Sequence, residues 1–404
     1  MSLTSMPASP VYMDISRLLS RAGMHVPTGI DRVEYEYAIY LQQNWSGPLT
    51  FVAYHPMHGI CPIDRNKISQ FLGLTAALWD GRKINPSTLK WMARRILLGV
   101  SLRKKRMCTQ GNTPPGIYLL LSHHHLMRAQ PIERFLTETR TRLAVMIHDI
   151  IPVEFPEYSR PGEDKRHLKR LDTVRRLAKS IIVPTQSVRT SLAPFMPTDV
   201  PIHVVAHGLH IWGVDEGADT LPQNLPKGPF FVCIGTIEPR KNHLLLLNIW
   251  RDMAHHLGRE TPALVIIGRR GWENENVVDM LERCPILQNV VIEYNNMDDQ
   301  QVIACLRRAR ALLFPSFTEG FGLPLLEAMA VKTPTVCSDL PVLREVAGSD
   351  ALYIDPTDGP AWKKAVMELM EDTSVVETDE ARISPSVSPW PDQVRLGLAA
   401  LHME

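Results

Sequence analysis

The sequence predicts an α/β fold made of two doubly wound domains that face each other across a cleft. In both halves of the chain, short apolar runs alternate with amphipathic stretches, which is typical of a parallel sheet with helices on both faces. The 404 residues exceed the usual size of one domain, and an apolar content of 45% can supply two cores. Polarity, Pro and Gly increase in DEGADTLPQNLPKGP, which separates the halves. The expected parts are an N-terminal domain at 1–207, a linker at 208–229, a C-terminal domain at 230–380, and a tail with a final helix at 381–404, for which a return to the N-terminal domain is one alternative.

The first half begins with a strand, a glycine loop and a helix. Thr28 and Gly29 precede a helix expected from about Asp31. This order is an anion-binding arrangement, although a single glycine is equally consistent with a plain turn. The prolines of IIPVEFPE at 150–157 are expected to exclude a helix there. The expected strands are 11–15, 49–53, 117–121, 143–147 and 181–184, and the expected helices lie near 131–142 and 164–179.

The second half repeats the alternation from residue 230 onward. The expected strands are 230–234, 264–267, 290–293, 312–314, 335–337 and 352–354. The expected helices lie near 241–257, 274–284, 298–309, 323–331 and 340–347, with a last helix from Trp390.

The stretch FPSFTEGFGLPLLEAMA at 314–330 is the most informative in the chain. It predicts a strand end, a loop in which Gly320 and Gly322 let the backbone approach a ligand, and a helix with Pro324 in its first turn. Free N–H groups at such a helix start attract an anion, most often a phosphate. The carboxylates of Glu319 and Glu327 would repel that phosphate, so they are better suited to accept hydrogen bonds from hydroxyls. A ligand with a diphosphate and many hydroxyls is a nucleotide sugar.

A second anion site is expected after the strand at 230–234, in GTIEPRKNH. Gly235 and Thr236 form the turn, and Glu238, Arg240 and Lys241 then lie at the carboxyl end of the strand, facing the same crevice. Arginine offers a planar fork for phosphate oxygens and lysine adds a point charge. The alternative is an exposed turn with ordinary surface charges.

His148 follows the apolar strand LAVMI, so we expect it at a strand end that faces the cleft. For a single histidine in such a place, a structural role is the more common alternative. Gly268-Arg269-Arg270-Gly271 follows the strand at 264–267 and either contacts a nucleotide base or forms a turn.

Residues 82–107 carry nine Lys/Arg and no acidic residue, with Trp91, Leu97 and other apolar residues interleaved. This pattern predicts attachment to an anionic membrane surface. The alternatives are a solvated helix with a docked apolar stripe and, with less support because no aromatic stacking platform accompanies the patch, RNA binding.

Composition excludes several classes of protein. The net charge is +1, which argues against a chain built around nucleic acid. The six cysteines are scattered without a C-x-x-C pair, so we expect no disulfide framework and a cytoplasmic location. No signal peptide is apparent at the N-terminus, and no run of about 18 apolar residues predicts a membrane span.

The motifs resemble those of the retaining glycosyltransferases of family 4, also called group 1, whose B-type fold has two Rossmann-like domains. The resemblance covers nearly the whole chain and is strongest at 230–356. The stretch at 314–348 contains the pair of glutamates that is typical of the family, Glu319 and Glu327, with seven residues between them. The chain departs from the family at His207-Gly208, where relatives commonly have Asn-Gly, and at 55–115 and 357–392, which match poorly. The pieces that carry the resemblance are PTGIDRVEYEYA at 27–38, HDIIPVEFPE at 148–157, GTIEPRKNHLLLL at 235–247 and FPSFTEGFGLPLLEAMAVKTPTVCSDLPVLREVAG at 314–348.

The resemblance implies a role for each matching residue. Arg240 and Lys241 would hold the donor diphosphate, Glu319 would accept hydrogen bonds from the transferred sugar, Glu327 would bind the nucleotide ribose, and His148 would contact the donor sugar. The catalytic set is therefore His148, Arg240, Lys241 and Glu319. The donor-binding set is Gly29, Gly235, Thr236, Glu238, Gly320, Phe321, Gly322, Leu323 and Glu327.

The implied activity is metal-independent, retaining transfer of a hexose, with mannose from GDP-mannose as the leading donor and other GDP- or UDP-sugars behind it. The implied acceptor is a glycan or a lipid-linked glycan in cell-surface polysaccharide synthesis, at the inner face of the cytoplasmic membrane. No cofactor is expected. The alternatives are a nucleotide-sugar-binding protein without turnover and another B-fold sugar-nucleotide enzyme, such as an epimerase or a phosphorylase.

Overall fold

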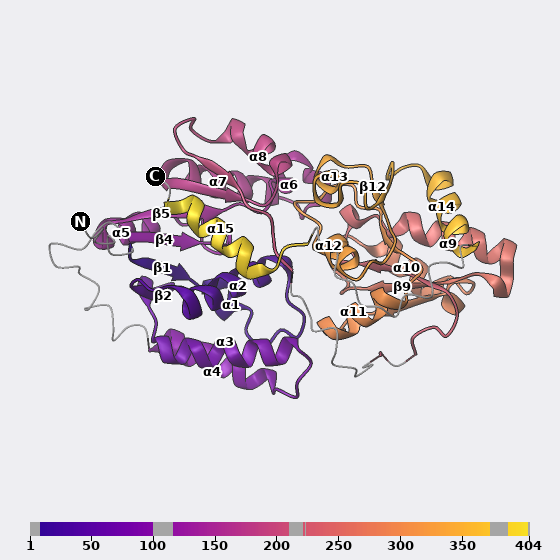
Figure 1. Ribbon diagram of the computed structural model, residues 1–404, viewed down its shortest axis with the longest axis horizontal. Helices are drawn as coiled ribbons and strands as arrows, with labels where there is room; N and C mark the ends of the chain where they lie inside the picture. Colours follow the sequence, from indigo (N-terminus) through magenta and orange to yellow (C-terminus); the bar gives the residue numbers. More distant parts are fainter. Residues whose placement is uncertain (1–8, 100–115, 210–220, 223, 372–386, 403–404) are drawn as a thin grey trace, which may run out of the picture.

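The computed structural model describes residues 9–99, 116–209, 221–222, 224–371 and 387–402. They form two α/β units that lie side by side along the long axis of the molecule (Figure 1). Each unit has one sheet, with seven strands in the first and six in the second. The predicted fold class, two doubly wound domains followed by a C-terminal helix, is confirmed.

The first sheet has the order β3-β2-β1-β4-β5-β6-β7. Every neighbouring pair is parallel except β2 and β3, which form an antiparallel hairpin at the edge. The edge strands β3 and β7 were not predicted. The strands are β1 (Val11–Asp14), β2 (Leu49–His55), β3 (Gly59–Pro62), β4 (Gly116–Leu120), β5 (Thr141–Met146), β6 (Ala178–Val183) and β7 (Ile202–Val204).

The helices of the first unit include one at a place where the prolines of the sequence predicted no helix. Helix α6 occupies Ile151–Glu154, so the prediction that prolines prevent a helix there was wrong. Pro152 lies in the first turn, where the missing N–H would have had no partner in any case. The helices are α1 (Ser16–Ser20), α2 (Gly29–Asn44), α3 (Arg65–Trp79), α4 (Pro86–Leu98), α5 (Ala129–Thr139), α6, α7 (Glu163–Leu177) and α8 (Gln186–Leu192).

The second sheet is parallel throughout, in the order β10-β9-β8-β11-β12-β13. Its strands are β8 (Phe230–Ile234), β9 (Ala263–Ile267), β10 (Val291–Tyr294), β11 (Leu312–Phe314), β12 (Thr335–Ser338) and β13 (Leu352–Ile354). Its helices are α9 (His243–Leu257), α10 (Glu275–Arg283), α11 (Asp299–Arg308), α12 (Leu323–Ala330), α13 (Pro341–Ala347) and α14 (Gly359–Glu371).

Both sheets are buried on their two faces, as the continuous apolar strands predict. In β1, Val11 and Met13 belong to one apolar cluster and Tyr12 packs against another, because alternate side chains point to opposite faces. In β8, Val232 belongs to a third apolar cluster and Phe231 to a fourth, on opposite faces of the second sheet. Each unit therefore has its own core.

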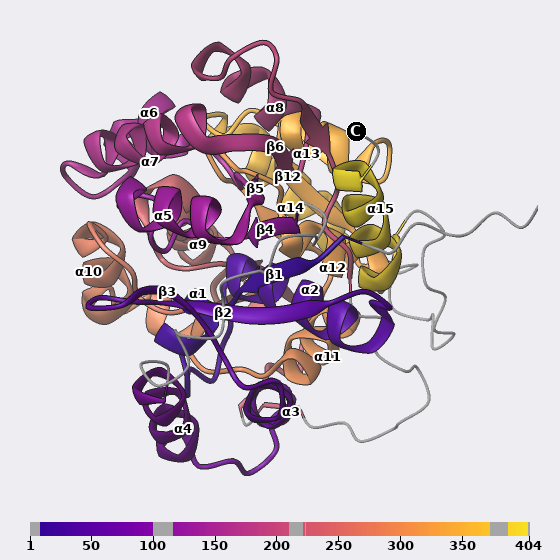
Figure 2. The ribbon, with the colours of Figure 1, turned by 90° about the vertical axis from the view of Figure 1, so that its left-hand side faces the viewer.

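The last helix, α15 (Trp390–His402), returns to the first unit and packs beside α2 (Figures 1 and 2). Leu209 forms a bridge with Pro389, so two segments of chain pass side by side between the units. A Cβ atom at Gly208 would lie 2.4 Å from the Cα of Trp390, which explains the glycine. The residues that α15 adds to the core of the first unit are Trp390, Val394, Leu398 and Leu401.

Helix α4 carries part of the predicted basic amphipathic segment. Leu89, Ala93 and Ile96 are buried against the first unit, whereas Trp91 and Leu98 are 57% and 74% exposed. Residues 100–107 of the segment lie outside the described residues. Within the described ranges, no helix has the length and apolar character needed to cross a membrane.

Candidate active site

A cleft of about 760 Å³ lies between the two units, at the carboxyl ends of the strands in both sheets. All thirteen predicted site residues lie on its wall: His148, Arg240, Lys241, Glu319, Gly29, Gly235, Thr236, Glu238, Gly320, Phe321, Gly322, Leu323 and Glu327. The fold thus gathers the predicted residues around one space, while their individual roles remain predictions.

The start of helix α12 forms one wall of the cleft. Gly322 has φ of +100°, a left-handed conformation that favours glycine, and the side chain of Leu343 would lie 3.0 Å from a Cβ atom there. Pro324 lies in the first turn, and no side chain caps the helix. Among the described residues, the backbone N–H groups of Gly322 and Leu323 have no side-chain acceptor, as in a helix end that binds an anion, whereas Leu325 donates to the carbonyl of Gly322.

Two cations and two carboxylates form an ionic cluster in the second unit. The Arg240 Nη1 atom donates to Glu319 Oε2 at 2.7 Å, and Arg240 Nε lies 2.5 Å from Glu238 Oε1. The Lys241 ammonium group donates to the other oxygen of Glu319 and lies 4.6 Å from the centre of the Phe314 ring. The cluster is formally neutral, so the two predicted phosphate-binding cations are already engaged by Glu319.

Burial and charge act against each other in this cluster. Burial alone would raise the pKa of Glu319, but Arg240 and Lys241 outweigh it and lower that pKa to about 2. Burial lowers the pKa of Lys241, and Glu319 opposes this effect. Glu319 is therefore an ionised carboxylate whose negative charge opposes the effect of burial on the pKa of Lys241.

Local backbone conformation places Lys241 in the cleft. Gly235 has φ of +151°, and a Cβ atom there would lie 3.2 Å from Lys241 Cε, so the glycine leaves room for the lysine stem. Asn242 is left-handed with φ of +54° and ends the turn Pro239–Lys241. The Asn242 side chain donates to the carbonyl of Pro356 at 2.9 Å, which fixes the turn before α9 begins.

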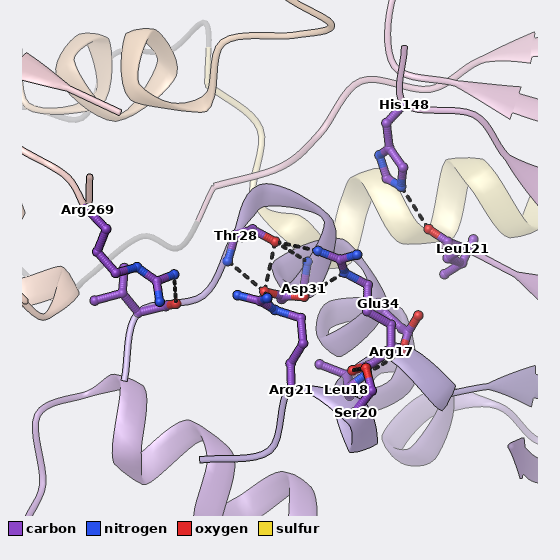
Figure 3. A network of polar contacts seen from close by, with 11 residues as sticks. Arg17, Leu18, Ser20, Arg21, Thr28, Asp31, Glu34, Leu121, His148 and Arg269 are labelled. Atoms are coloured by element: carbon purple, nitrogen blue, oxygen red, sulfur yellow. Dashed lines mark hydrogen bonds and ion pairs between the residues drawn. The ribbon is translucent and has the colours of Figure 1, made fainter. Parts of the chain in front are cut away.

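His148 projects from the first unit, after β5. Its Nε2 atom lies 2.8 Å from the carbonyl oxygen of Leu121 (Figure 3), and because a carbonyl only accepts, Nε2 carries the proton and Nδ1 is left as an acceptor. Burial lowers the pKa of His148 to about 4, so the imidazole is neutral. Its ring lies 5.8 Å from that of His207, which also contacts Phe321 with ring centres 4.7 Å apart.

Gly29 is the first residue of helix α2, so this helix begins two residues earlier than expected. Thr28 caps it in a capping box with Asp31. Arg17 and Arg21 each place Nε 2.7 Å from the Asp31 carboxylate, and Figure 3 shows both guanidinium groups around it. Arg17, which also lines the cleft, was not predicted, because its position depends on a carboxylate fourteen residues away.

Polar contacts join the two units directly. Arg32 of α2 donates through both terminal nitrogens to the two carboxylate oxygens of Asp299 on α11, with Nη1 to Oδ2 at 2.6 Å. Glu345 of α13 accepts the backbone N–H groups of Gln186 at 2.6 Å and Ser187 at 3.1 Å, at the start of α8. Neither contact was predicted. Polar contacts therefore hold the two units together at two separate places.

Aromatic contacts also cross the cleft. The rings of Tyr158 and Phe317 stack with their centres 5.2 Å apart and an angle of 3° between the ring planes. The guanidinium of Arg160 lies 5.1 Å from the ring centre of Trp272. The Arg269 side chain donates to the carbonyl of Val26 at 3.4 Å (Figure 3), so the GRRG turn touches the opposite unit.

In the described part of the chain, no group of three or more acidic, histidine or cysteine side chains is arranged to hold a metal ion. The five cysteines that fall within the described ranges are free thiols.

Comparison with known proteins relates the second unit to one family and the chain to several mannosyltransferases. The family model for glycosyl transferases group 1 matches residues 220–384. The sequence is 29% identical over 243 residues to the serotype-specific mannosyltransferase WbdA of Escherichia coli, covering 55% of this chain and 29% of that protein. It is 27% identical over 286 residues to the O-antigen chain mannosyltransferase RfbU of Salmonella typhimurium, covering 69% of this chain and 68% of that one. The chain thus spans less than a third of WbdA.

Solved structures share the whole fold. The structure of Anabaena Alr3699/HepE in complex with UDP and glucose has a TM-score of 0.62 at 13% identity, covering 98% of this chain and 100% of that one. Sucrose-phosphate synthase from Thermosynechococcus elongatus has a TM-score of 0.60 at 15% identity, and the match covers 98% of this chain and 97% of that one. Residues 220–384 therefore match the glycosyl transferases group 1 family, the whole chain has the two-Rossmann B-type fold, and its sequence is similar to those of mannosyltransferases.

Proposed function

We propose that the protein transfers a hexose from a nucleoside-diphosphate sugar to a glycan or lipid-linked glycan acceptor, with retention of the anomeric configuration. The observation that carries this proposal is the placement of Arg240, Lys241 and the start of α12 beside Glu319, with His148 opposite, on one cleft between two domains. Cations and helix N–H groups suit a diphosphate, and carboxylates suit sugar hydroxyls.

Donor binding would rearrange the neutral ionic cluster. The diphosphate would take up donors of Arg240 and Lys241 that now serve Glu319, which would free Glu319 to accept from the hydroxyls of the sugar. Glu327, one turn inside α12, lines the same cleft and would accept from the ribose hydroxyls. GDP-mannose is the first donor to test, because the relatives WbdA and RfbU are named as mannosyltransferases.

The residues present can assist departure of the nucleotide. When the bond from the sugar to the diphosphate breaks, negative charge grows on the leaving phosphate and positive character grows on the sugar ring. Arg240, Lys241 and the N–H groups of α12 would stabilise the phosphate, so we propose that no metal ion is required. The acceptor hydroxyl would attack from the face the phosphate leaves and give it the proton, which retains configuration. The neutral His148 imidazole would contact the sugar, and closure of the cleft would exclude water.

The acceptor side of the proposal involves helix α4. Trp91 and Leu98 are exposed beside Lys90, Arg94 and Arg95, and this surface would bring the protein to anionic lipids at the inner face of the cytoplasmic membrane. Replacing Arg94 and Arg95 by glutamine and Trp91 by alanine should reduce binding to vesicles containing anionic lipid. Undiminished sedimentation with those vesicles would refute the membrane contact.

The test of the proposed function is a panel of GDP- and UDP-sugars, each incubated with the protein and a lipid-linked or free glycan acceptor. Release of the nucleoside diphosphate together with a new α-linked product is expected, and its persistence in EDTA would support independence from metal. Conversion of one nucleotide sugar into another would favour an epimerase. Stabilisation by a nucleotide sugar without any turnover would favour a binding protein.

A further inference from the structure

One arginine lies between two carboxylates where helix α2 of the first unit meets α11 and α12 of the second. The side chains of Arg32 and Asp299 are only 17% and 9% exposed, and Arg32 donates to both oxygens of Asp299. Glu327 lines the cleft beside them, and within the described residues it receives no hydrogen bond. The cation is thus committed to Asp299, and Glu327 keeps its lone pairs free.

The charges that act on Glu327 come from the two neighbouring elements. Burial is the largest influence and, together with Asp299, raises the pKa of Glu327 to about 7, while Arg32 opposes this rise. Glu36, one turn along α2, also acts on Arg32. The ionised fraction of Glu327 near neutral pH therefore depends on which partner Arg32 holds.

We infer that Arg32 and Asp299 are positioning residues for the nucleotide: Asp299 holds the guanidinium of Arg32 near Glu327, where its positive charge favours the carboxylate form, yet away from a direct ion pair that would block the oxygens of Glu327. The inference rests on the proposed function, in which Glu327 accepts from the ribose hydroxyls. Since Arg32 comes from the first unit, only the closed cleft completes the nucleotide site, so nucleotide binding and closure favour each other.

Removing either partner has a distinct consequence. Without Arg32, two buried carboxylates face each other and Glu327 takes up a proton more readily, so nucleotide binding moves to higher pH. Without the charge of Asp299, Arg32 is free to pair with Glu327, so the carboxyl ionises at lower pH but its oxygens are occupied. A mere clamp between domains would weaken binding in both cases without moving its pH dependence.

The test is the dissociation constant of GDP, and of UDP in parallel, measured by calorimetry from pH 5.5 to 9 for the full chain and its variants. We expect Arg32→Met to move the midpoint of binding upward by about one pH unit or more, and Asp299→Asn to move it downward. At pH 8.5, Asp299→Asn should bind about tenfold more weakly than wild type, and adding Arg32→Met should restore part of that loss.

Glu345→Gln is the matched control, because it weakens the other contact between the units, at the start of α8, without facing Glu327. It should weaken nucleotide binding without moving the midpoint. Equal losses with an unmoved midpoint in all three single variants would overturn the inference in favour of a clamp, and so would unchanged binding by the Arg32 and Asp299 variants. If wild type binds neither nucleotide, the proposed function itself fails.

Discussion

Gly320 offers a direct test of the closed cleft as the working geometry. A Cβ atom there would lie 2.5 Å from the carbonyl oxygen of His148 and 3.0 Å from Cβ of Asp149, across the cleft. Contact distances of about 3.5 Å are normal, so Gly320→Ala must separate the two walls by roughly 1 Å. The neighbouring atoms are backbone and Cβ atoms, which cannot move aside by changing rotamer. A displacement of that size typically costs on the order of 100-fold in rate.

The assay is the initial rate of sugar transfer, with small-angle X-ray scattering to follow the separation of the units. Gly73→Ala is the matched control, because nothing lies within 4 Å of a Cβ atom at that position of α3, which does not line the cleft. We expect Gly320→Ala to lose about 100-fold in rate with little change in thermal stability, since opening the cleft relieves the clash without disturbing either core. Full activity of Gly320→Ala, or equal losses in both variants, would refute the reasoning.

Two further predictions concern pH and stability. Burial, reinforced by Asp14, raises the pKa of Glu34 to about 8, above the ordinary value of 4.5, so the stability of the fold should fall as pH rises from about 4.5 to 8. The Glu34→Gln side chain can still accept the backbone N–H of Leu18, which lies 2.9 Å from Glu34. In urea unfolding at pH 8.5, this variant should be more stable than wild type by on the order of 3–5 kcal/mol. An unchanged pH dependence in that variant would contradict the assignment. Burial depresses the pKa of His148 to about 4, so stability should be lost as pH falls from 6.5 towards 4, and His148→Gln should flatten this decline by on the order of 3 kcal/mol. If wild type and variant decline in parallel, the buried imidazole is not the cause.

Much of the fold was predictable because its elements carry local signals. The apolar run before Gly235 and the pair Gly322 and Pro324 each specify a strand end or a helix start through backbone preferences alone. The spacing from Thr28 to Asp31 is a capping signal, and the structure shows the capping box there. These signals place the glycine loops after the carboxyl ends of strands, and every predicted site residue lines the cleft that these ends face.

Other elements gave no local signal. Strand β3, Gly59–Pro62, contains a glycine and a proline and is tolerated only because it lies at the edge of the sheet. Helix α6 was wrongly excluded because proline was treated as a breaker without regard to its position in the first turn.

Contacts between the units were beyond the reach of sequence patterns. Arg32 and Asp299 are 267 residues apart, and each alone resembles an ordinary surface charge. The spacing from Asp298 to Gln301 is a capping signal that locates the start of α11, but it does not reveal which helix the neighbouring carboxylate will face. Such pairs emerge only when both domains are folded and placed.

The central claim is that Lys241 and its neighbours stabilise the departing diphosphate. The most direct measurement is the rate of nucleoside-diphosphate release at saturating donor and acceptor for wild type and Lys241→Ala. We expect Lys241→Ala to lose activity on the order of 30- to 1,000-fold, equivalent to about 2–4 kcal/mol of barrier. Turnover by Lys241→Ala at the rate of wild type would contradict it.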